Sequence, residues 1–186
     1  MIKILCISGK SGSGKDTIVN KLVKEHEFKK IVTYTSRPIR EKEEQDVTYH
    51  FISEEEFIQK INEGFFLEYK TYNTTSGIWY YGTSIESIEF ADDKSVIILT
   101  PQGVRDLKKK LPEKKLTCIY LYVNGMTAMI RTMQRGDDLN EISRRLKHDD
   151  VDFDGFENEA DVIINNCDYR NFENVFREIL NVVEDI

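Results

Sequence analysis

The sequence contains no apolar run that approaches the ~20 residues of a membrane-spanning helix, and its N-terminal apolar run is too short for a secretory signal. Only three cysteines are present, at positions 6, 118 and 167, and two of them lie in apolar, strand-like runs. An odd number of widely spaced cysteines is typical of reduced thiols and indicates neither a disulfide framework nor a metal site. We therefore expect a cytoplasmic protein with no membrane partner.

Linker-like sequence is also scarce. The 186 residues include three prolines, no Gly/Ser-rich tract and no internal repeat, which predicts a single domain over residues 1–186. A composition of 40% hydrophobic and 32% charged residues is typical of a folded chain. Because the net charge is -7, we expect no nucleic-acid partner. The expected oligomeric state is a monomer or a homodimer.

Apolar runs and helical patterns alternate along much of the chain. Short apolar runs, typical of strands buried on both faces, occupy residues 2–8, 95–100, 117–123 and 161–166. Apolar residues have helical spacing at 17–25, 103–111, 125–135 and 172–183. Strands that alternate with helices predict an α/β fold, with a parallel sheet core flanked by helices.

Two stretches break this alternation. Residues 33–83 are rich in Tyr, Phe and Thr and hold one helical pattern, at 54–62, so we expect a small strand-rich insertion. Residues 131–150 are charged and too polar for a core, although such charge runs are usually solvated helix faces. The core then consists of residues 1–32, 84–130 and 151–186.

The segment GKSGSGKDT, residues 9–17, follows the first expected strand and precedes the first expected helix. It fits a nucleotide phosphate-binding loop except that Asp16 stands where Ser or Thr is usual. Backbone N–H groups of such a loop converge on phosphate oxygens, and Lys15 would add a positive charge. The ending G-K-x-T resembles that of nucleoside monophosphate kinases, in which the hydroxyl comes one place later, here at Thr17. The expected ATP-binding residues are Ser11, Gly12, Ser13, Gly14, Lys15, Asp16 and Thr17.

Arg37 and Arg40 lie three residues apart, and Tyr49 follows downstream. Guanidinium groups match phosphate oxygens in geometry, and a tyrosine hydroxyl can add a hydrogen bond. These residue types suit a second phosphate site, but two surface arginines explain the pattern equally well.

The motifs TSRPIRE, YHFIS, EEF, GFFLE, YYGTS and QGV follow one another along the chain, and RG, RRL and VIIN come further along. This is the order that they have in the guanylate kinase family, which the chain as a whole resembles. The resemblance implies a P-loop kinase in which residues 33–83 bind the acceptor monophosphate and residues 131–150 form a helical lid. It also implies an enzyme that transfers phosphate from ATP to (d)GMP with Mg²⁺.

The same resemblance implies roles for individual residues in the acceptor region. Arg37, Arg40, Tyr49 and Tyr81 would hold the acceptor phosphate, and Thr33, Glu68 and Thr83 would read the guanine edge. The carboxylate of Glu68 can accept hydrogen bonds from N1–H and from the exocyclic amine of guanine. Adenine has no such pair of donors and would leave a buried charge unpaired.

The resemblance implies further roles on the donor side. Arg135 and Arg145 of the lid would supply positive charge to the transferring group, with Arg131 and Arg144 as weaker candidates. Asn165 would lie near the adenine, and Thr17 would bind Mg²⁺. The implied catalytic residues are Lys15, Arg37, Arg135 and Arg145.

The sequence departs from the family pattern in three places. Ile98 and Thr100 replace two aspartates that precede the family's Gln-Gly, so the family's usual Mg²⁺ arrangement does not carry over directly. Asp16 could compensate by orienting metal-bound water. Residues 69–80 are about four residues longer than the family's usual link, a change that surface loops tolerate. Residues 41–44 replace the usual glycines, and we expect this to change only the shape of the loop.

Two alternatives remain open at this point. The longer link beside the base pocket could change the acceptor to another nucleoside or deoxynucleoside monophosphate. The loss of both aspartates could indicate a guanylate-kinase-like binding module without turnover, although Lys15 and the lid arginines are present.

Overall fold

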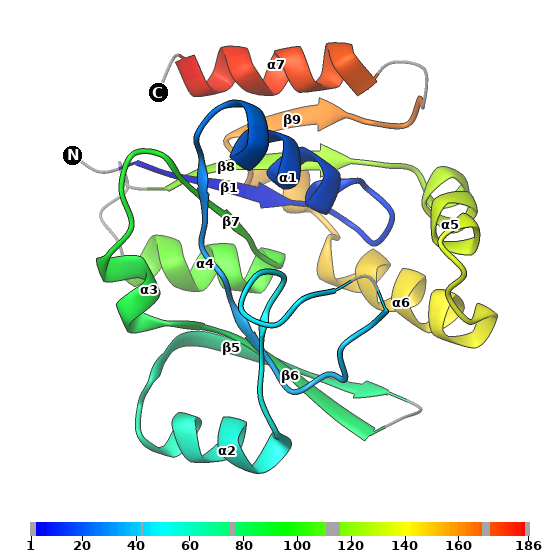
Figure 1. Cartoon of the computed structure of the whole chain (residues 1–186). Helices are drawn as coiled ribbons and strands as arrows, with labels where there is room; N and C mark the ends of the chain where they lie inside the picture. Colours follow the sequence, from blue (N-terminus) through cyan, green and yellow to red (C-terminus); the bar gives the residue numbers. More distant parts are fainter. Residues whose placement is uncertain (1–2, 42, 75–76, 111–115, 169–171, 185–186) are drawn as a thin grey trace.

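The computed structural model describes residues 3–41, 43–74, 77–110, 116–168 and 172–184 (Figure 1). Its core is a five-stranded parallel sheet with the strand order β2-β7-β1-β8-β9. The strands are β1 (Ile4–Ser8), β2 (Lys29–Lys30), β7 (Ser95–Ile98), β8 (Leu116–Tyr122) and β9 (Val162–Asn165). Helices cover both faces of this sheet, which confirms the expected α/β fold.

Alternate residues of β1 enter two different hydrophobic clusters. Ile4 and Cys6 pack on one face of the sheet together with residues of α4, whereas Leu5 and Ile7 pack on the other face with residues of α1 and α7. These helices are α1 (Lys15–Glu25), α4 (Pro101–Lys110) and α7 (Phe172–Glu184). Because β1 is buried on both faces, it fixes the position of the loop that leaves its carboxyl end.

The strand-rich region forms a second, four-stranded sheet with the order β4-β3-β6-β5. Its elements are β3 (Tyr34–Thr35), β4 (His50–Phe51), α2 (Glu54–Asn62), β5 (Phe66–Thr74) and β6 (Gly77–Ser84). β5 and β6 pair in antiparallel fashion as a long hairpin, which lies at the end of the molecule opposite α7 in Figure 1. Phe57 of α2 stacks on Phe66 of β5 with ring centroids 4.3 Å apart, which attaches the helix to the sheet.

The charged stretch 131–150 covers the end of α5 and most of α6. The remaining helices are α3 (Ile85–Glu89), α5 (Gly125–Gln134), α6 (Leu139–Asp152) and the short 3₁₀ helix η2 (Phe156–Asn158). The side chain of Asp138 accepts hydrogen bonds from the N–H groups of Asn140 and Glu141 and so begins α6. Ile142 is only 2% exposed, so α6 buries this apolar side chain against the rest of the protein. The many charged residues around it made this packing hard to predict from the sequence.

Several element ends differ from the sequence-based expectation by a few residues. α1 begins at Lys15 and α4 at Pro101, each two positions earlier than expected, and proline is well suited to a first helical position. β7 ends at Ile98, whereas the sequence predicted an end at residue 100. The predicted start of the first strand, residue 2, and the predicted end of the helix at 103–111 lie outside the described residues. Within the described part of the chain, no helix is both long and apolar enough to cross a membrane.

Candidate active site

The phosphate loop joins β1 to α1, and two of its glycines have left-handed backbone angles. The angle φ is +74° at Gly12 and +95° at Gly14, and a Cβ atom at Gly12 would lie 2.7 Å from the backbone oxygen of Ala128. Glycine is therefore required at position 12 for conformational and steric reasons. The loop passes directly into α1, and the free N–H groups at the N-terminus of a helix favour an anion.

Lys15 lies inside the curve of the loop. Its Nζ donates hydrogen bonds to the carbonyl oxygens of Gly9, at 2.6 Å, and Lys10, at 3.0 Å. Burial lowers the pKa of Lys15, whereas the charges of Asp16 and Asp149 oppose this shift. The ammonium group is thus placed where a phosphate oxygen can replace the loop carbonyls as its partner.

Two contacts to the loop come from residues that sequence reasoning missed. Nδ2 of Asn166, a buried residue, donates to the carbonyl oxygen of Ser13 at 2.8 Å. The N–H of Ser11 donates to Oδ2 of Asp149 on α6 at 2.6 Å. Asn165, the predicted residue, is exposed, and its side chain accepts from the N–H of Cys167 at 3.0 Å. Asn165 was predicted to lie near the adenine, and the contact with the loop is made by its neighbour Asn166.

Arg37 is buried and holds a fixed orientation. Its guanidinium donates to both carboxylate oxygens of Glu43, at 2.9 and 2.7 Å, and the backbone N–H of Arg40 donates to the same carboxylate at 2.9 Å. The prediction that residues 41–44 change only the shape of the loop is therefore wrong for Glu43. Glu43 belongs to the predicted acceptor-phosphate site because it orients the first arginine and ties the second to it.

The two predicted tyrosines lie beside this arginine. The ring centroids of Tyr49 and Tyr81 are 6.0 Å apart in an edge-to-face arrangement, and Cζ of Arg37 lies 5.7 Å from the centroid of the Tyr49 ring. Burial raises the pKa of Tyr49, so its hydroxyl stays protonated at neutral pH and can donate a hydrogen bond. The structure brings together Arg37, Tyr49 and Tyr81.

Positive charge from the lid reaches both phosphate-binding regions. Burial lowers the pKa of Arg40, and the positive charges of Arg145, Arg37 and Arg135 lower it further. The charge of Arg135 also lowers the pKa of Lys15. Charged residues of the loop, the acceptor region and the lid are therefore close enough to affect one another's pKa values.

Carboxylates hold the lid arginines in place. Arg135 pairs with Asp137, and Nε of Arg145 lies 2.7 Å from Oε1 of Glu141. Arg144 donates to both oxygens of Glu141, at 2.8 and 2.9 Å, and its hydrogen bond lowers the pKa of Glu141 to about 2. These pairs fix the orientation of the lid arginines.

Arg131 reaches the phosphate loop from the end of α5. Its Nη1 donates to the carbonyl oxygen of Gly12 at 3.2 Å. Arg131 thus lies beside the phosphate loop, and its role toward the donor stays a prediction.

Glu68 and Thr83 meet on facing strands of the hairpin. Oγ1 of Thr83 donates to Oε1 of Glu68 at 2.5 Å, and Thr83 is buried. Burial raises the pKa of Glu68, the hydrogen bond from Thr83 opposes this shift, and the negative charge of Asp106 adds to it. Thr33, the third predicted base-reading residue, precedes β3, and its carbonyl oxygen accepts from the N–H of His50.

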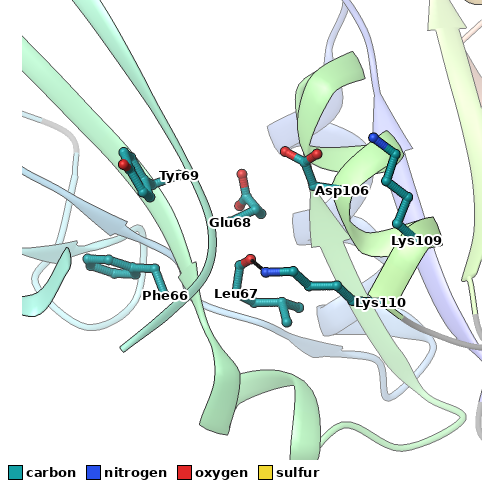
Figure 2. A pocket seen from close by; sticks show the side chains of 7 residues that line it. All are labelled: Phe66, Leu67, Glu68, Tyr69, Asp106, Lys109 and Lys110. Carbon is teal, nitrogen blue, oxygen red and sulfur yellow. Dashed lines mark hydrogen bonds between the residues drawn. The ribbon is translucent and has the colours of Figure 1, made fainter. Parts of the chain in front are cut away.

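A hollow of about 290 Å³ lies between β5 and α4, and Glu68 forms part of its wall. Figure 2 shows Glu68 on the strand side and Asp106 on the helix side of this space, with Lys110 reaching across to the carbonyl oxygen of Leu67. Its volume is near the lower end of the ~300–1,000 Å³ of typical ligand pockets. Asp106 was not predicted, because one acid on a charged helix gives no signal in the sequence.

The end of β7 carries no carboxylate. Thr100 accepts a hydrogen bond on Oγ1 from the N–H of Gly103 at 3.2 Å and so caps α4. Within the described residues, no group of three or more His, Cys, Asp and Glu side chains is placed to hold a metal ion. Asp16 and Thr17 are exposed at the start of α1, and one or two protein oxygens suit a Mg²⁺ ion that is bound mainly by phosphates.

Comparison with known proteins gives a consistent result. The family model described as guanylate kinase matches residues 1–185. The guanylate kinase of Wolinella succinogenes is 34% identical over 181 residues, which cover 95% of this chain and 82% of that protein. The guanylate kinase of Malacoplasma penetrans is 31% identical over 185 residues, which cover 96% of this chain and 92% of that protein.

A solved structure shares the fold. The crystal structure of guanylate kinase from Anaplasma phagocytophilum aligns with a TM-score of 0.71 and 22% sequence identity, over 98% of this chain and 85% of that chain. This match supports the arrangement of the two sheets and the helices around them.

Proposed function

Because the chain belongs to the guanylate kinase family, we propose that it transfers the γ-phosphoryl group of ATP to GMP or dGMP. The products are ADP and GDP or dGDP. An oxygen of the acceptor phosphate attacks the γ-phosphorus while the bond to the oxygen that bridges the β- and γ-phosphates breaks. No side chain needs to act as a nucleophile, so the protein contributes position and charge.

The observation that carries this proposal is the gathering of cations from three separate segments. Lys15 comes from the phosphate loop, Arg37 and Arg40 from the acceptor region, and Arg135 and Arg145 from the lid. Carboxylates pair with Arg37, Arg135 and Arg145, and phosphate oxygens would be further partners for the same guanidinium groups. A site built this way suits two phosphorylated ligands whose phosphates meet in the middle.

On the donor side, the loop amides and Lys15 hold the β- and γ-phosphates. The donor residues that we propose are Ser11, Gly12, Ser13, Gly14, Lys15, Asp16, Thr17, Arg131 and Asn165. Asn166 supports the loop through its contact with Ser13. Arg135 and Arg145 stabilise the negative charge of the transferring group and exclude water.

On the acceptor side, Arg37, Arg40, Tyr49 and Tyr81 bind the monophosphate. Thr33, Glu68 and Thr83 bind the base, and the ionised carboxylate of Glu68 accepts from the N1–H and amine of guanine. The bond from Thr83 leaves one oxygen of Glu68 and further lone pairs for the base.

We propose that the donor is bound with Mg²⁺, which neutralises charge on the β- and γ-phosphates. Thr17 would contact the metal directly, and Asp16 would contact it through water. The charge of Asp16 contributes to the pKa shifts of Lys15, Tyr49 and Arg135, which supports a role for Asp16 near the bound phosphates.

We further propose a single domain, residues 1–186, in which 33–83 bind the acceptor and 131–150 form the lid. The core comprises residues 1–32, 84–130 and 151–186. The partners are nucleotides, the assembly is a monomer or homodimer, and the location is the cytoplasm. These proposals rest on the family and on the composition of the chain.

The test is ADP release from ATP and Mg²⁺ with each common nucleoside or deoxynucleoside monophosphate as acceptor, with the Lys15→Ala variant as the blank. Turnover with GMP or dGMP alone supports the proposal. Turnover with other bases would show that the long hairpin has changed the base site. Binding of GMP without turnover on any acceptor would contradict the kinase assignment and favour a binding module.

A further inference from the structure

The long hairpin rests on α6, the main helix of the lid. Lys70 of β5 forms an ion pair with Asp152, and the side chains are 24% and 22% exposed. Two residues further along β5, the ring of Tyr72 meets that of His148 edge-on, with centroids 6.5 Å apart. Contact between hairpin and helix therefore spans more than one turn of α6.

A third contact lies nearer the start of α6. Nη1 of Arg144 donates to the carbonyl oxygen of Asn73 at 3.4 Å. Lys70, Tyr72 and Asn73 all lie in β5. One strand of the hairpin therefore contacts α6 at three places.

The same part of α6 holds the phosphate loop. Asp149 accepts from the N–H of Ser11 at 2.6 Å, and Asp150 forms an ion pair with Lys10 at 2.7 Å. These two acids lie between His148 and Asp152 in the sequence. Two turns of one helix therefore contact the hairpin of the acceptor region and the loop of the donor site.

Lys70 lies close to the residues proposed to bind the acceptor. It pairs with Tyr81 in the register of β5 and β6, and it lies two residues from Glu68 on the same face of the strand. Lys70 therefore connects the part of the hairpin that holds Tyr81 and Glu68 to Asp152 of α6.

We propose that α6 couples the two sites, with Lys70 and Asp152 as positioning residues. Acceptor binding fixes the hairpin, the hairpin holds α6, and α6 holds the phosphate loop in the conformation that binds the donor. This inference rests on the proposed function, since it takes GMP as the acceptor and ATP as the donor. Because coupling is reciprocal, the donor increases acceptor affinity by the same factor.

The experiment is calorimetric titration of a non-hydrolysable ATP analogue with Mg²⁺, with and without saturating GMP. We expect GMP to increase the affinity of the natural chain for the analogue by a factor of roughly 5 to 150, the usual range for coupled sites. Lys70→Met and Asp152→Asn should each bring this factor close to one. Without GMP, analogue affinity should change less than about twofold, because neither residue touches the phosphate loop.

A double variant and a control variant test whether the effect comes from the ion pair between Lys70 and Asp152. Combining Lys70→Met with Asp152→Asn should cause no further loss, because both remove one ion pair. The matched control is Lys21→Met, which removes the ion pair of Lys21 with Glu173 between α1 and α7 and touches neither the hairpin nor α6. It should leave the coupling factor unchanged, and melting temperatures should confirm that every variant is folded.

Three outcomes are distinguishable. Full coupling in both Lys70→Met and Asp152→Asn would overturn the inference. Natural protein that binds both nucleotides with no change in affinity would also overturn it, and would leave the proposed function intact. Natural protein that fails to bind GMP would contradict the proposed function itself.

Discussion

Nη2 of Arg37 lies 2.7 Å from Oε1 of Glu43, and Nη1 of the same guanidinium lies 2.9 Å from Oε2. Because the Arg37 side chain is only 3% exposed, its charge depends on this carboxylate for compensation. The backbone N–H of Arg40 bonds to the same group. Glu43 thus determines the direction in which the first proposed phosphate-binding arginine points.

Glu43→Ala should weaken both folding and acceptor binding. Removal of one partner of a buried ion pair costs about 3–5 kcal/mol, because the other charge stays buried and unpaired. Urea denaturation should show a loss near the lower end of that range, and the KM for GMP should rise more than kcat falls. Glu44→Gln is the control, since Glu44 is exposed and should change either quantity little. An unchanged KM in a destabilised Glu43→Ala would show that Glu43 supports only the fold.

The elements of the core could be predicted because the strands are continuous apolar runs and the helices carry apolar residues at helical spacing. The strands at 4–8, 95–98, 116–122 and 162–165 are short and apolar, and the helices between them have one apolar face. Glu43 could not be found in this way. Its role depends on a turn that brings it back to Arg37, and the sequence shows only a run of charges.

The contacts of α6 show the same limit. Its charges are typical of a solvated helix face, and the lid with its arginines was assigned by resemblance. Asp149 and Ser11 are far apart in the sequence, so only the structure shows the hydrogen bond between them. Asn165 and Asn166 alternate across β9 and the residue that follows it, and only the structure shows which one faces the loop. Long-range contacts of this kind have no signature in a single sequence.

Protonation of Glu68 should make kcat/KM for GMP fall on the acid side of its pH profile, a fall called the acid limb. Because burial raises its pKa above the ordinary value of 4.5, the carboxylate takes up a proton at a higher pH than an exposed glutamate. As the pH falls toward that pKa, Glu68 can no longer accept from both guanine donors, so kcat/KM for GMP falls. The measurement is the pH profile of kcat/KM.

Glu68→Gln tests the assignment of that limb. The variant should lose about 10- to 100-fold in kcat/KM for GMP at neutral pH, the cost of one charge-assisted hydrogen-bond pair. The remaining activity should show no acid limb from this group. A limb that persists unchanged in Glu68→Gln would assign it to another carboxylate, and Asp106→Asn would then be the next variant to measure.

Asp16 should affect the Mg²⁺ requirement. It follows Lys15 directly and is exposed at the start of α1, while the end of β7 offers Ile98 and Thr100 in place of acids. Asp16→Ala should therefore raise the Mg²⁺ concentration for half-maximal ADP release by roughly tenfold, about 1.4 kcal/mol. Asn20→Ala, also exposed on α1, serves as the control. Equal Mg²⁺ dependence in Asp16→Ala and the natural chain would rule out a role for Asp16 in the metal site.

Glu141 should make the lid sensitive to acid. Its hydrogen bond from Arg144 lowers the pKa from 4.5 to about 2, and Arg145 contributes to the shift. Because the folded pKa lies below the unfolded one, the stabilisation is fully present above about pH 4.5 and is lost as the pH falls through about 2. The contribution should be about 1 kcal/mol, the upper end for ion pairs that water can reach.

Glu141→Gln should therefore lower the free energy of unfolding by about that amount at pH 7. Between pH 4.5 and 2 its stability should fall less steeply than that of the natural chain, because one carboxylate with a lowered pKa is missing. Urea denaturation at several pH values measures both effects. Glu56→Gln is the control, because its pair with Lys60 is longer, at 3.8 Å, and its side chain is 50% exposed. If the two variants lose stability equally at every pH, the arginine pairs of Glu141 do not stabilise α6, and the lid arginines must be oriented by their other contacts.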